Sequence, residues 1–148
     1  MKPEFQTKQQ PKKVLFLCTG NSCRSQMAEA ITNTLLTSEW KAYSAGTHPT
    51  GEIHPLAIQA LHEIGIEHHG YSKNVSELQD ITFNLVVTVC DSAAEECPIW
   101  LGPGIRRHHS FPDPAKALGS EEVRLQAFRR VRDRIVIEIP NLLEKVVA

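Results

Sequence analysis

The strongest constraint on the fold is a short apolar run that passes through a loop of small residues into a helix. Residues 14–17 are wholly apolar, which is typical of a strand buried on both faces of a parallel sheet. The loop 18–23 contains Gly, Asn and Ser, and apolar residues at helical spacing then predict a helix over about 24–37. A buried strand followed at once by a helix favours an α/β fold.

The rest of the chain repeats this alternation. The pattern predicts strands at 43–45, 85–89 and 105–111, and helices at 55–64 and from Ser120 onward. Pro140 is expected to interrupt or kink the last helix. Strands that alternate with helices predict a parallel sheet with helices on both faces. At 148 residues the chain fits one domain, expected over 13–148 after a flexible lead-in at 1–12.

Composition excludes several classes of protein. Lys and Arg number 16 against 17 Asp and Glu, and this near-neutral charge argues against non-specific nucleic-acid binding. No apolar run approaches the roughly 18 residues of a membrane span, and residues 1–13 lack the apolar stretch of a secretory signal. A cytoplasmic protein with reduced thiols is expected. The cysteine spacing does not favour a zinc site, so no metal is expected from these thiols.

The loop 18–25 has the composition of an anion-binding site. Its small residues allow successive backbone N–H groups to converge at a helix N-terminus, where the dipole adds positive charge. Arg24 offers a planar fork for two oxygens of a tetrahedral oxyanion, and the same field favours a Cys18 thiolate. The alternative is that Cys18 is a buried small hydrophobe and Arg24 a surface residue. The expected oxyanion-binding residues are Thr19, Gly20, Asn21, Ser22, Cys23 and Arg24.

A second thiol is expected near the first. Cys18 and Cys90 each follow a predicted strand directly, so both are expected at the same edge of the sheet. Cys97 lies seven residues after Cys90. A pair of thiols can supply two electrons by forming a disulfide, which a single thiol cannot do alone. The alternative is that Cys90 and Cys97 are structural thiols, because cysteine is commonly buried.

These motifs resemble the signature of low-molecular-weight protein tyrosine phosphatases and of the arsenate reductases that share their fold. The resemblance rests on residues 14–25, Tyr43-Ser-Ala-Gly46 and Asp113-Pro114, and extends from Lys13 to about Arg134. It implies a single α/β domain with a four-stranded parallel sheet in a flavodoxin-like order, the first strand lying beside the one that ends at Val89. The implied catalytic residues are Cys18 as nucleophile, Arg24 as oxyanion clamp, Ser25 as hydroxyl donor to the thiolate, and Asp113 as general acid. For Asp113, the alternative is an aspartate that only shapes a proline-flanked turn.

The spacing of Cys90 and Cys97, followed by Pro98, resembles the thioredoxin-coupled arsenate reductases. This resemblance implies that arsenate esterifies Cys18, that Cys90 expels arsenite, and that Cys97 then attacks Cys90. Thioredoxin is the implied electron donor, phosphate the competing anion, and a monomer is expected. The alternative function is a tyrosine phosphatase that uses Cys18, Arg24 and Asp113. Ala115 stands where such phosphatases commonly carry an aromatic residue.

No tightly bound cofactor is expected, but a potassium ion is considered. Some members of the resembled family bind potassium beside the oxyanion loop, and Asn21, Glu29 and Ser44 match positions associated with that ion. Ser72-Lys73-Asn74 stands where those members carry Thr-Ser-Asp. A lysine at this position argues against a cation.

Overall fold

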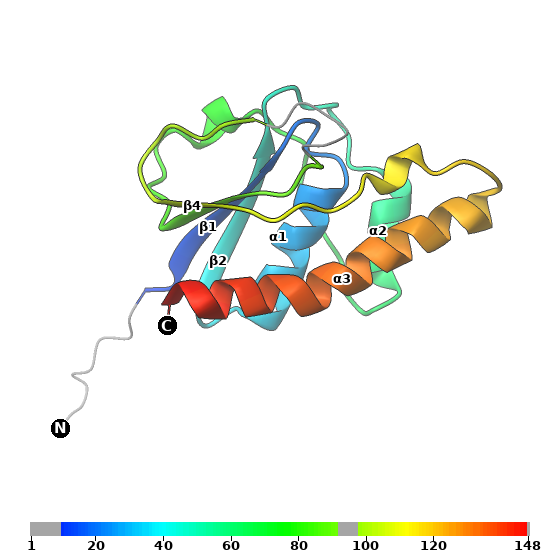
Figure 1. Cartoon of the computed structure of the whole chain (residues 1–148). Helices are drawn as coiled ribbons and strands as arrows, with labels where there is room; N and C mark the ends of the chain where they lie inside the picture. Colours follow the sequence, from blue (N-terminus) through cyan, green and yellow to red (C-terminus); the bar gives the residue numbers. More distant parts are fainter. Residues whose placement is uncertain (1–9, 92–97, 148) are drawn as a thin grey trace.

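A computed structural model describes residues 10–91 and 98–147. Its centre is a four-stranded sheet in the order β2-β1-β3-β4, in which all neighbouring strands are parallel (Figure 1). This arrangement confirms the predicted fold class and the predicted neighbours of the first strand. The strands are β1 (Lys12–Cys18), β2 (Trp40–Gly46), β3 (Leu85–Thr88) and β4 (Ile105–His108). β1 therefore includes Lys12, which the sequence places in the lead-in.

The strand β1 lies in the middle of the molecule, as its apolar run predicts. Val14 and Phe16 point into a core shared with the helices, whereas Leu15 and Leu17 point into a smaller core on the opposite face. All four side chains are at most 2 % exposed. Because successive strand residues face opposite sides, a strand buried on both faces must be apolar at every position.

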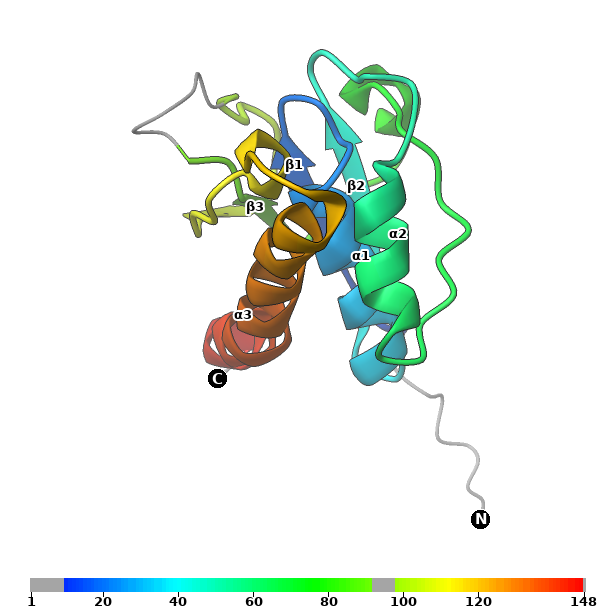
Figure 2. The same cartoon turned by 90° about the vertical axis from the view of Figure 1, so that its right-hand side faces the viewer.

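The three α-helices all pack on one face of the sheet (Figure 2). This layering corrects the expectation of helices on both faces, because among the described residues the opposite face carries a short 3₁₀-helix and no α-helix. Val75, Leu78 and Ile81 cover that face at a spacing of three residues, which suits a 3₁₀ turn rather than an α-helix. The helices are α1 (Arg24–Leu35), α2 (Pro55–His62) and α3 (Glu121–Val147), and the 3₁₀-helices are η1 (Val75–Leu78) and η2 (Pro114–Lys116).

The last helix continues through its proline. α3 runs past Pro140 as one continuous helix, so the interruption that the sequence allows for does not occur. Ile135, Ile139 and Leu143 are fully buried on either side of the proline. Burial of this apolar stripe outweighs the local cost of the missing backbone donor. Within residues 10–91 and 98–147, no helix is long and apolar enough to cross a membrane.

Candidate active site

A cavity of about 350 Å³ opens where β1 passes into α1. It joins the predicted oxyanion loop to Asp113, which lies far along the chain, and to the loop that follows β2. The arrangement agrees with the rule that open α/β sheets bind ligands at the carboxyl ends of their strands. The lining residues are Cys18, Thr19, Gly20, Asn21, Ser22, Cys23, Arg24, Thr50, His54, Asp113 and Ala115.

The sulfur of Cys18 lies 2.9 Å from the Ser25 hydroxyl oxygen at the start of α1. Asn21 Nδ2 donates a hydrogen bond to the same Ser25 oxygen at 2.8 Å. Either atom of the contact between Cys18 and Ser25 can be the donor, because a hydroxyl oxygen that accepts one hydrogen bond keeps a second lone pair. When the sulfur carries no hydrogen, as in a thiolate, the Ser25 hydroxyl is the donor in this contact.

Asn21 gives the loop its shape. Its φ of 49° lies in the left-handed region, which asparagine tolerates better than most residues. Its Oδ1 accepts from the Lys73 backbone N–H and from Gln26 Nε2, both at 2.9 Å. These bonds come from two segments of the chain, so the strained conformation is held from outside the loop.

The chain after β2 forms backbone hydrogen bonds with the oxyanion loop. Backbone N–H groups of His48, Thr50 and His54 donate to the carbonyls of Thr19, Gly20 and Ser22, at 2.9, 3.0 and 3.1 Å. These three carbonyls therefore already accept hydrogen bonds from the protein itself. Carbonyls that are bonded to protein repel an approaching anion less, which favours the anion-binding nest that the sequence predicts.

Arg24 is 5 % exposed, which excludes the alternative of a surface residue. Its Nη1 donates to the Phe111 carbonyl at 3.2 Å, and its Nη2 lies 3.9 Å from Asp113 Oδ2. Asp113 also caps η2, where its Oδ1 accepts from the Ala115 N–H at 3.0 Å. Asp113 thus shapes a turn and also places a carboxylate at the cavity.

The remaining thiols differ in their surroundings. Burial and the nearby Asp113 raise the pKa of Cys23 to about 12, so this thiol stays protonated at neutral pH. Cys90 is fully buried and disulfide-bonded, whereas Cys18 and Cys23 are free thiols. Val89 N–H donates to the Leu17 carbonyl at 3.0 Å, so Cys90 follows β3 at the edge where Cys18 ends β1. Cys97 lies outside the described residues.

The sequence analysis missed two residues of the cavity, Thr50 and His54. His54 caps α2, and its Nδ1 accepts the Leu56 N–H at 3.1 Å. Burial lowers the pKa of His54, as does the nearby Arg124. Its neutral ring therefore carries the hydrogen on Nε2. The signal in the sequence is a capping residue before Pro55 at the start of a helix.

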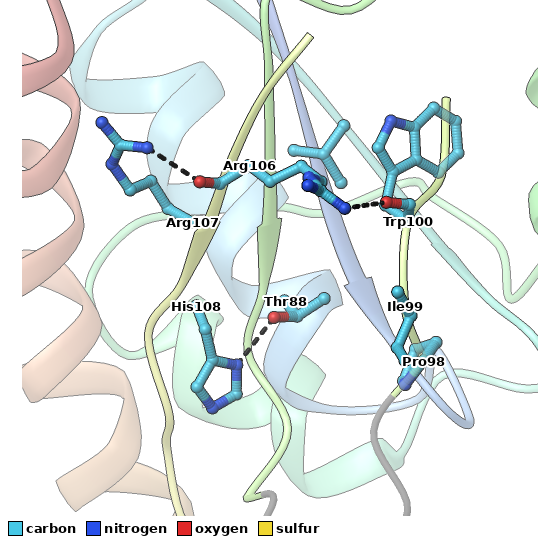
Figure 3. A pocket seen from close by; sticks show the side chains of 8 residues that line it. Thr88, Pro98, Ile99, Trp100, Arg106, Arg107 and His108 are labelled. Carbon is cyan, nitrogen blue, oxygen red and sulfur yellow. Dashed lines mark hydrogen bonds between the residues drawn. The ribbon is translucent and has the colours of Figure 1, made fainter. Parts of the chain in front are cut away.

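Aromatic side chains lie elsewhere. No Phe, Tyr or Trp is among the described residues that line the cavity at Cys18. Trp100 borders a second cavity, of about 400 Å³, beside β3 and β4 (Figure 3). There Arg106 Nη1 donates to the Trp100 carbonyl at 3.0 Å, and the Thr88 hydroxyl lies 2.7 Å from His108 Nδ1. The described lining of this second cavity contains neither a thiol nor a carboxylate.

Comparisons with known proteins agree with this geometry. The family model of low molecular weight phosphotyrosine protein phosphatases matches residues 13–148. Arsenate reductase of Bacillus subtilis strain 168 is 46% identical over 125 residues, which cover 82% of this chain and 88% of the relative. Arsenate reductase of Shouchella clausii strain KSM-K16 is 44% identical over 135 residues, or 88% and 94% of the two chains. A solved arsenate reductase in the phosphate binding state is 29% identical, with a TM-score of 0.69 over 91% of this chain and 98% of that one.

Proposed function

Because the chain belongs to the low molecular weight phosphotyrosine protein phosphatase family, we propose that it uses the oxyanion site of that family to reduce arsenate to arsenite. The observation that carries the proposal is the placement of Cys90 after β3, beside the strand that ends in Cys18. Hydrolysis of a phosphate ester needs one thiol at this edge. Reduction of an oxyanion needs a second thiol that can form a disulfide with the first.

The first step is formation of a thiolate ester. Arsenate enters the cavity, where the backbone N–H groups of the loop and the Arg24 guanidinium bind its oxygens. The Cys18 thiolate attacks arsenic, and one arsenate oxygen leaves as water after it accepts a proton. Asp113 lies at the cavity and, in its protonated form, supplies that proton. Arsenic remains at oxidation state five in this ester.

The second step transfers the electrons. The Cys90 thiolate attacks the sulfur of Cys18, so a disulfide forms between the two cysteines while the sulfur–arsenic bond breaks. The electron pair of that bond stays on arsenic, which leaves as arsenite. Both thiols are oxidised by one electron each, which balances the two-electron reduction of arsenic.

Regeneration of the nucleophile completes the cycle. Cys97 attacks the sulfur of Cys90, and Cys18 is released as a thiolate. The disulfide between Cys90 and Cys97 is then reduced by thioredoxin, through exchange with its dithiol. A disulfide-bonded Cys90 together with a free Cys18, as in the structure, is compatible with the later state of this cycle, in which Cys18 has already been released from Cys90.

The decisive experiment measures two reactions of the same preparation. Arsenite release is followed with arsenate, thioredoxin, thioredoxin reductase and NADPH, and hydrolysis of an aryl phosphate is followed separately. Cys18→Ser is expected to abolish both. Cys90→Ser and Cys97→Ser are each expected to abolish thioredoxin-driven turnover while a slow phosphatase activity remains, which serves as the control for an intact Cys18 site.

Two results would contradict the proposal in different ways. Rapid aryl phosphate hydrolysis without arsenite release would identify a phosphatase. Multiple-turnover arsenate reduction by Cys97→Ser would leave the activity in place but refute the relay of three thiols.

A further inference from the structure

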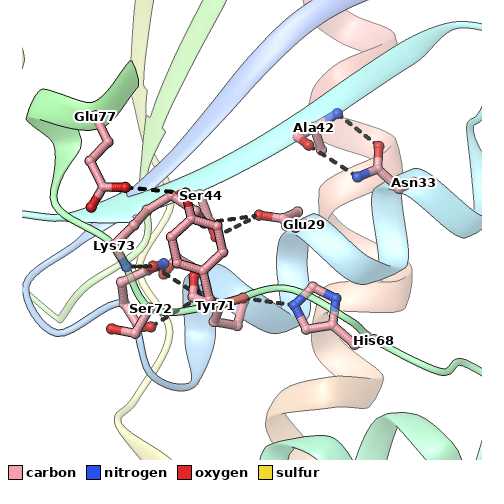
Figure 4. A network of polar contacts seen from close by, with 12 residues as sticks. Glu29, Asn33, Ala42, Ser44, His68, Tyr71, Ser72, Lys73 and Glu77 are labelled. Atoms are coloured by element: carbon pink, nitrogen blue, oxygen red, sulfur yellow. Dashed lines mark hydrogen bonds and ion pairs between the residues drawn. The ribbon is translucent and has the colours of Figure 1, made fainter. Parts of the chain in front are cut away.

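A buried lysine and a partly buried glutamate form an ion pair near the oxyanion loop (Figure 4). Lys73 is 7 % exposed, and its Nζ donates to the Ser44 carbonyl of β2 at 3.0 Å. The same Nζ lies 4.0 Å from Glu29 Oε1 of α1 and 4.6 Å from the centre of the Tyr71 ring. The Ser44 hydroxyl donates to Glu29 Oε1 at 2.7 Å. The ammonium therefore lies among a carboxylate, a carbonyl and an aromatic face, which are groups that stabilise a cation.

The residues in this cluster do not fit a potassium ion. The side-chain oxygens that match a potassium site are already engaged: Glu29 Oε1 accepts the Ser44 hydroxyl, and Asn21 Oδ1 accepts two N–H groups. The Ser44 carbonyl accepts a hydrogen bond from the Lys73 ammonium. A second positive charge here would lie next to the Lys73 ammonium and would share the nearby carboxylates, Glu29 and Glu77, with it.

The opposite charges of Lys73 and Glu29 offset part of the free-energy cost of burying them. Burial lowers the pKa of Lys73, and the nearby Glu29 and Glu77 raise it again. Burial likewise raises the pKa of Glu29, which the Ser44 hydrogen bond and Lys73 lower. Each partner therefore favours the charged form of the other, as expected for a buried ion pair.

Lys73 is also tied to the nucleophile through its backbone. Its N–H donates to Asn21 Oδ1 and its carbonyl accepts the Gly46 N–H, both at 2.9 Å. Asn21 in turn donates to the Ser25 hydroxyl, which contacts the sulfur of Cys18. The side chain of Lys73 thus fixes the position of a backbone N–H that orients Asn21.

We propose that Lys73 is a positioning residue that acts as a built-in monovalent cation. Its ammonium neutralises Glu29 and holds residue 73 against β2, so that Asn21 and Ser25 stay oriented toward Cys18 without a potassium ion. The proposal depends on anion binding beside Cys18 and does not require that the anion be reduced.

The test compares the full-length wild type with Lys73→Met and Lys73→Asp. Two properties are measured in potassium chloride and in choline chloride at equal ionic strength: the phosphate concentration that half-protects Cys18 from iodoacetamide, by mass spectrometry, and the thermal midpoint. The matched control is Lys41→Met, because Lys41 also lies over a tyrosine ring, that of Tyr43 at 5.4 Å, but is exposed.

The wild type and Lys41→Met are expected to give the same values in both salts. In Lys73→Met the half-protecting phosphate concentration should rise at least about fivefold in either salt. Lys73→Asp places a second carboxylate beside Glu29, so it should lose protection in choline chloride. Potassium should restore that protection and raise the thermal midpoint of Lys73→Asp. If Lys73 had only a structural role, neither property would respond to potassium.

Several results would overturn the proposal. A wild type that needs potassium would show that a cation binds beside Lys73. A Lys73→Met variant that behaves like Lys41→Met would remove the positioning role. Should Lys73→Met fail to fold, the response of Lys73→Asp to potassium decides, and no response refutes the proposal. Complete absence of phosphate protection in the wild type would refute the anion site itself, whereas the arsenite assay tests the reductase separately.

Discussion

Gly46 shows how closely single residues are fitted around the oxyanion loop. A Cβ at this position would lie 2.4 Å from the Thr19 carbonyl oxygen and 3.1 Å from the Asn21 nitrogen. Both are backbone atoms of the loop, so they cannot turn aside as a flexible side chain would. The glycine at the end of Tyr43-Ser-Ala-Gly46 is therefore explained by close approach of two backbones.

Gly46→Ala should displace the loop from β2. We expect a loss of about 1–3 kcal/mol in the free energy of unfolding, because the inserted methyl group overpacks the site. Phosphate protection of Cys18 should weaken as well. The free energy of unfolding is measured by chemical denaturation, and phosphate protection is measured by iodoacetamide alkylation of Cys18.

Gly65→Ala is the control for this substitution. Its φ of 82° strains any other residue, but no atom lies within 4 Å of an added Cβ. It should cost roughly 1–2 kcal/mol in stability and leave phosphate protection unchanged. Equal loss of protection in both variants would show that stability, and not loop position, is being measured.

At the scale of elements, α3 is fastened to its neighbours by charged side chains. Glu138 accepts from His109 Nε2 and Arg134 Nε, both at 2.7 Å, which links the helix to the chain after β4. Arg132 is 8 % exposed and donates to the Ala60 carbonyl of α2 at 2.9 Å. Part of the arginine-rich face of the helix thus contacts protein, although its pattern alone suits a solvated face.

Glu138→Gln tests the contribution of the Glu138 ion pairs through the pH dependence of thermal stability. Arg134, and less strongly His109, hold the pKa of Glu138 at about 2, below the ordinary value of 4.5. A depressed pKa stabilises the folded chain above the unfolded value, and this stabilisation is lost as the pH falls toward the folded value. The wild type should therefore melt at a higher temperature than Glu138→Gln near neutral pH. The difference should shrink between about pH 5 and about pH 2.

Thermal midpoints across this pH range check the prediction. Glu144→Gln is the control, because Glu144 is an exposed glutamate on the same helix. Its difference from the wild type should be small at every pH. A difference for Glu138→Gln that stays constant down to the lowest pH would rule out the ion pair as its cause.

At the scale of the whole molecule, a side chain of the hydrophobic core packs against a residue that lines the cavity. Phe128 of α3 is fully buried, and its ring centre lies 4.6 Å from that of His54. His54 lines the cavity and caps α2. Packing between α2 and α3 therefore determines the position of His54, and with it one side of the cavity.

Phe128→Ala should affect both stability and anion binding. A large core deletion costs about 3–5 kcal/mol, and the space left behind frees the His54 ring to move. Leu143→Ala removes a fully buried side chain from the same helix and core, and Leu143 is not among the residues that line the cavity. It should lower stability by about 2–5 kcal/mol and spare phosphate protection. Equal weakening of protection by both variants would contradict the link between Phe128 and the cavity.

Several features follow from the sequence alone. The run at 14–17 predicts a strand buried on both faces, and the loop after it predicts convergent N–H groups at a helix N-terminus. The position of Cys90 after a second strand predicts that it lies at the same edge of the sheet as Cys18, because parallel strands end at the same edge. The buried strand and the sheet edge of Cys90 are confirmed, because they depend on the local period of apolar residues and on rules that hold for every parallel sheet. The convergence of the N–H groups stays a prediction.

Other features were decided only by the tertiary structure. No local pattern places Thr50 and His54 at the cavity, or the Lys73 ammonium between Glu29 and Ser44. The single helical face of the sheet and the unbroken path of α3 through Pro140 likewise result from which apolar surfaces bury one another. Such contacts join residues far apart in the chain, and their free energy depends on the complete packed arrangement, which no short stretch of sequence contains.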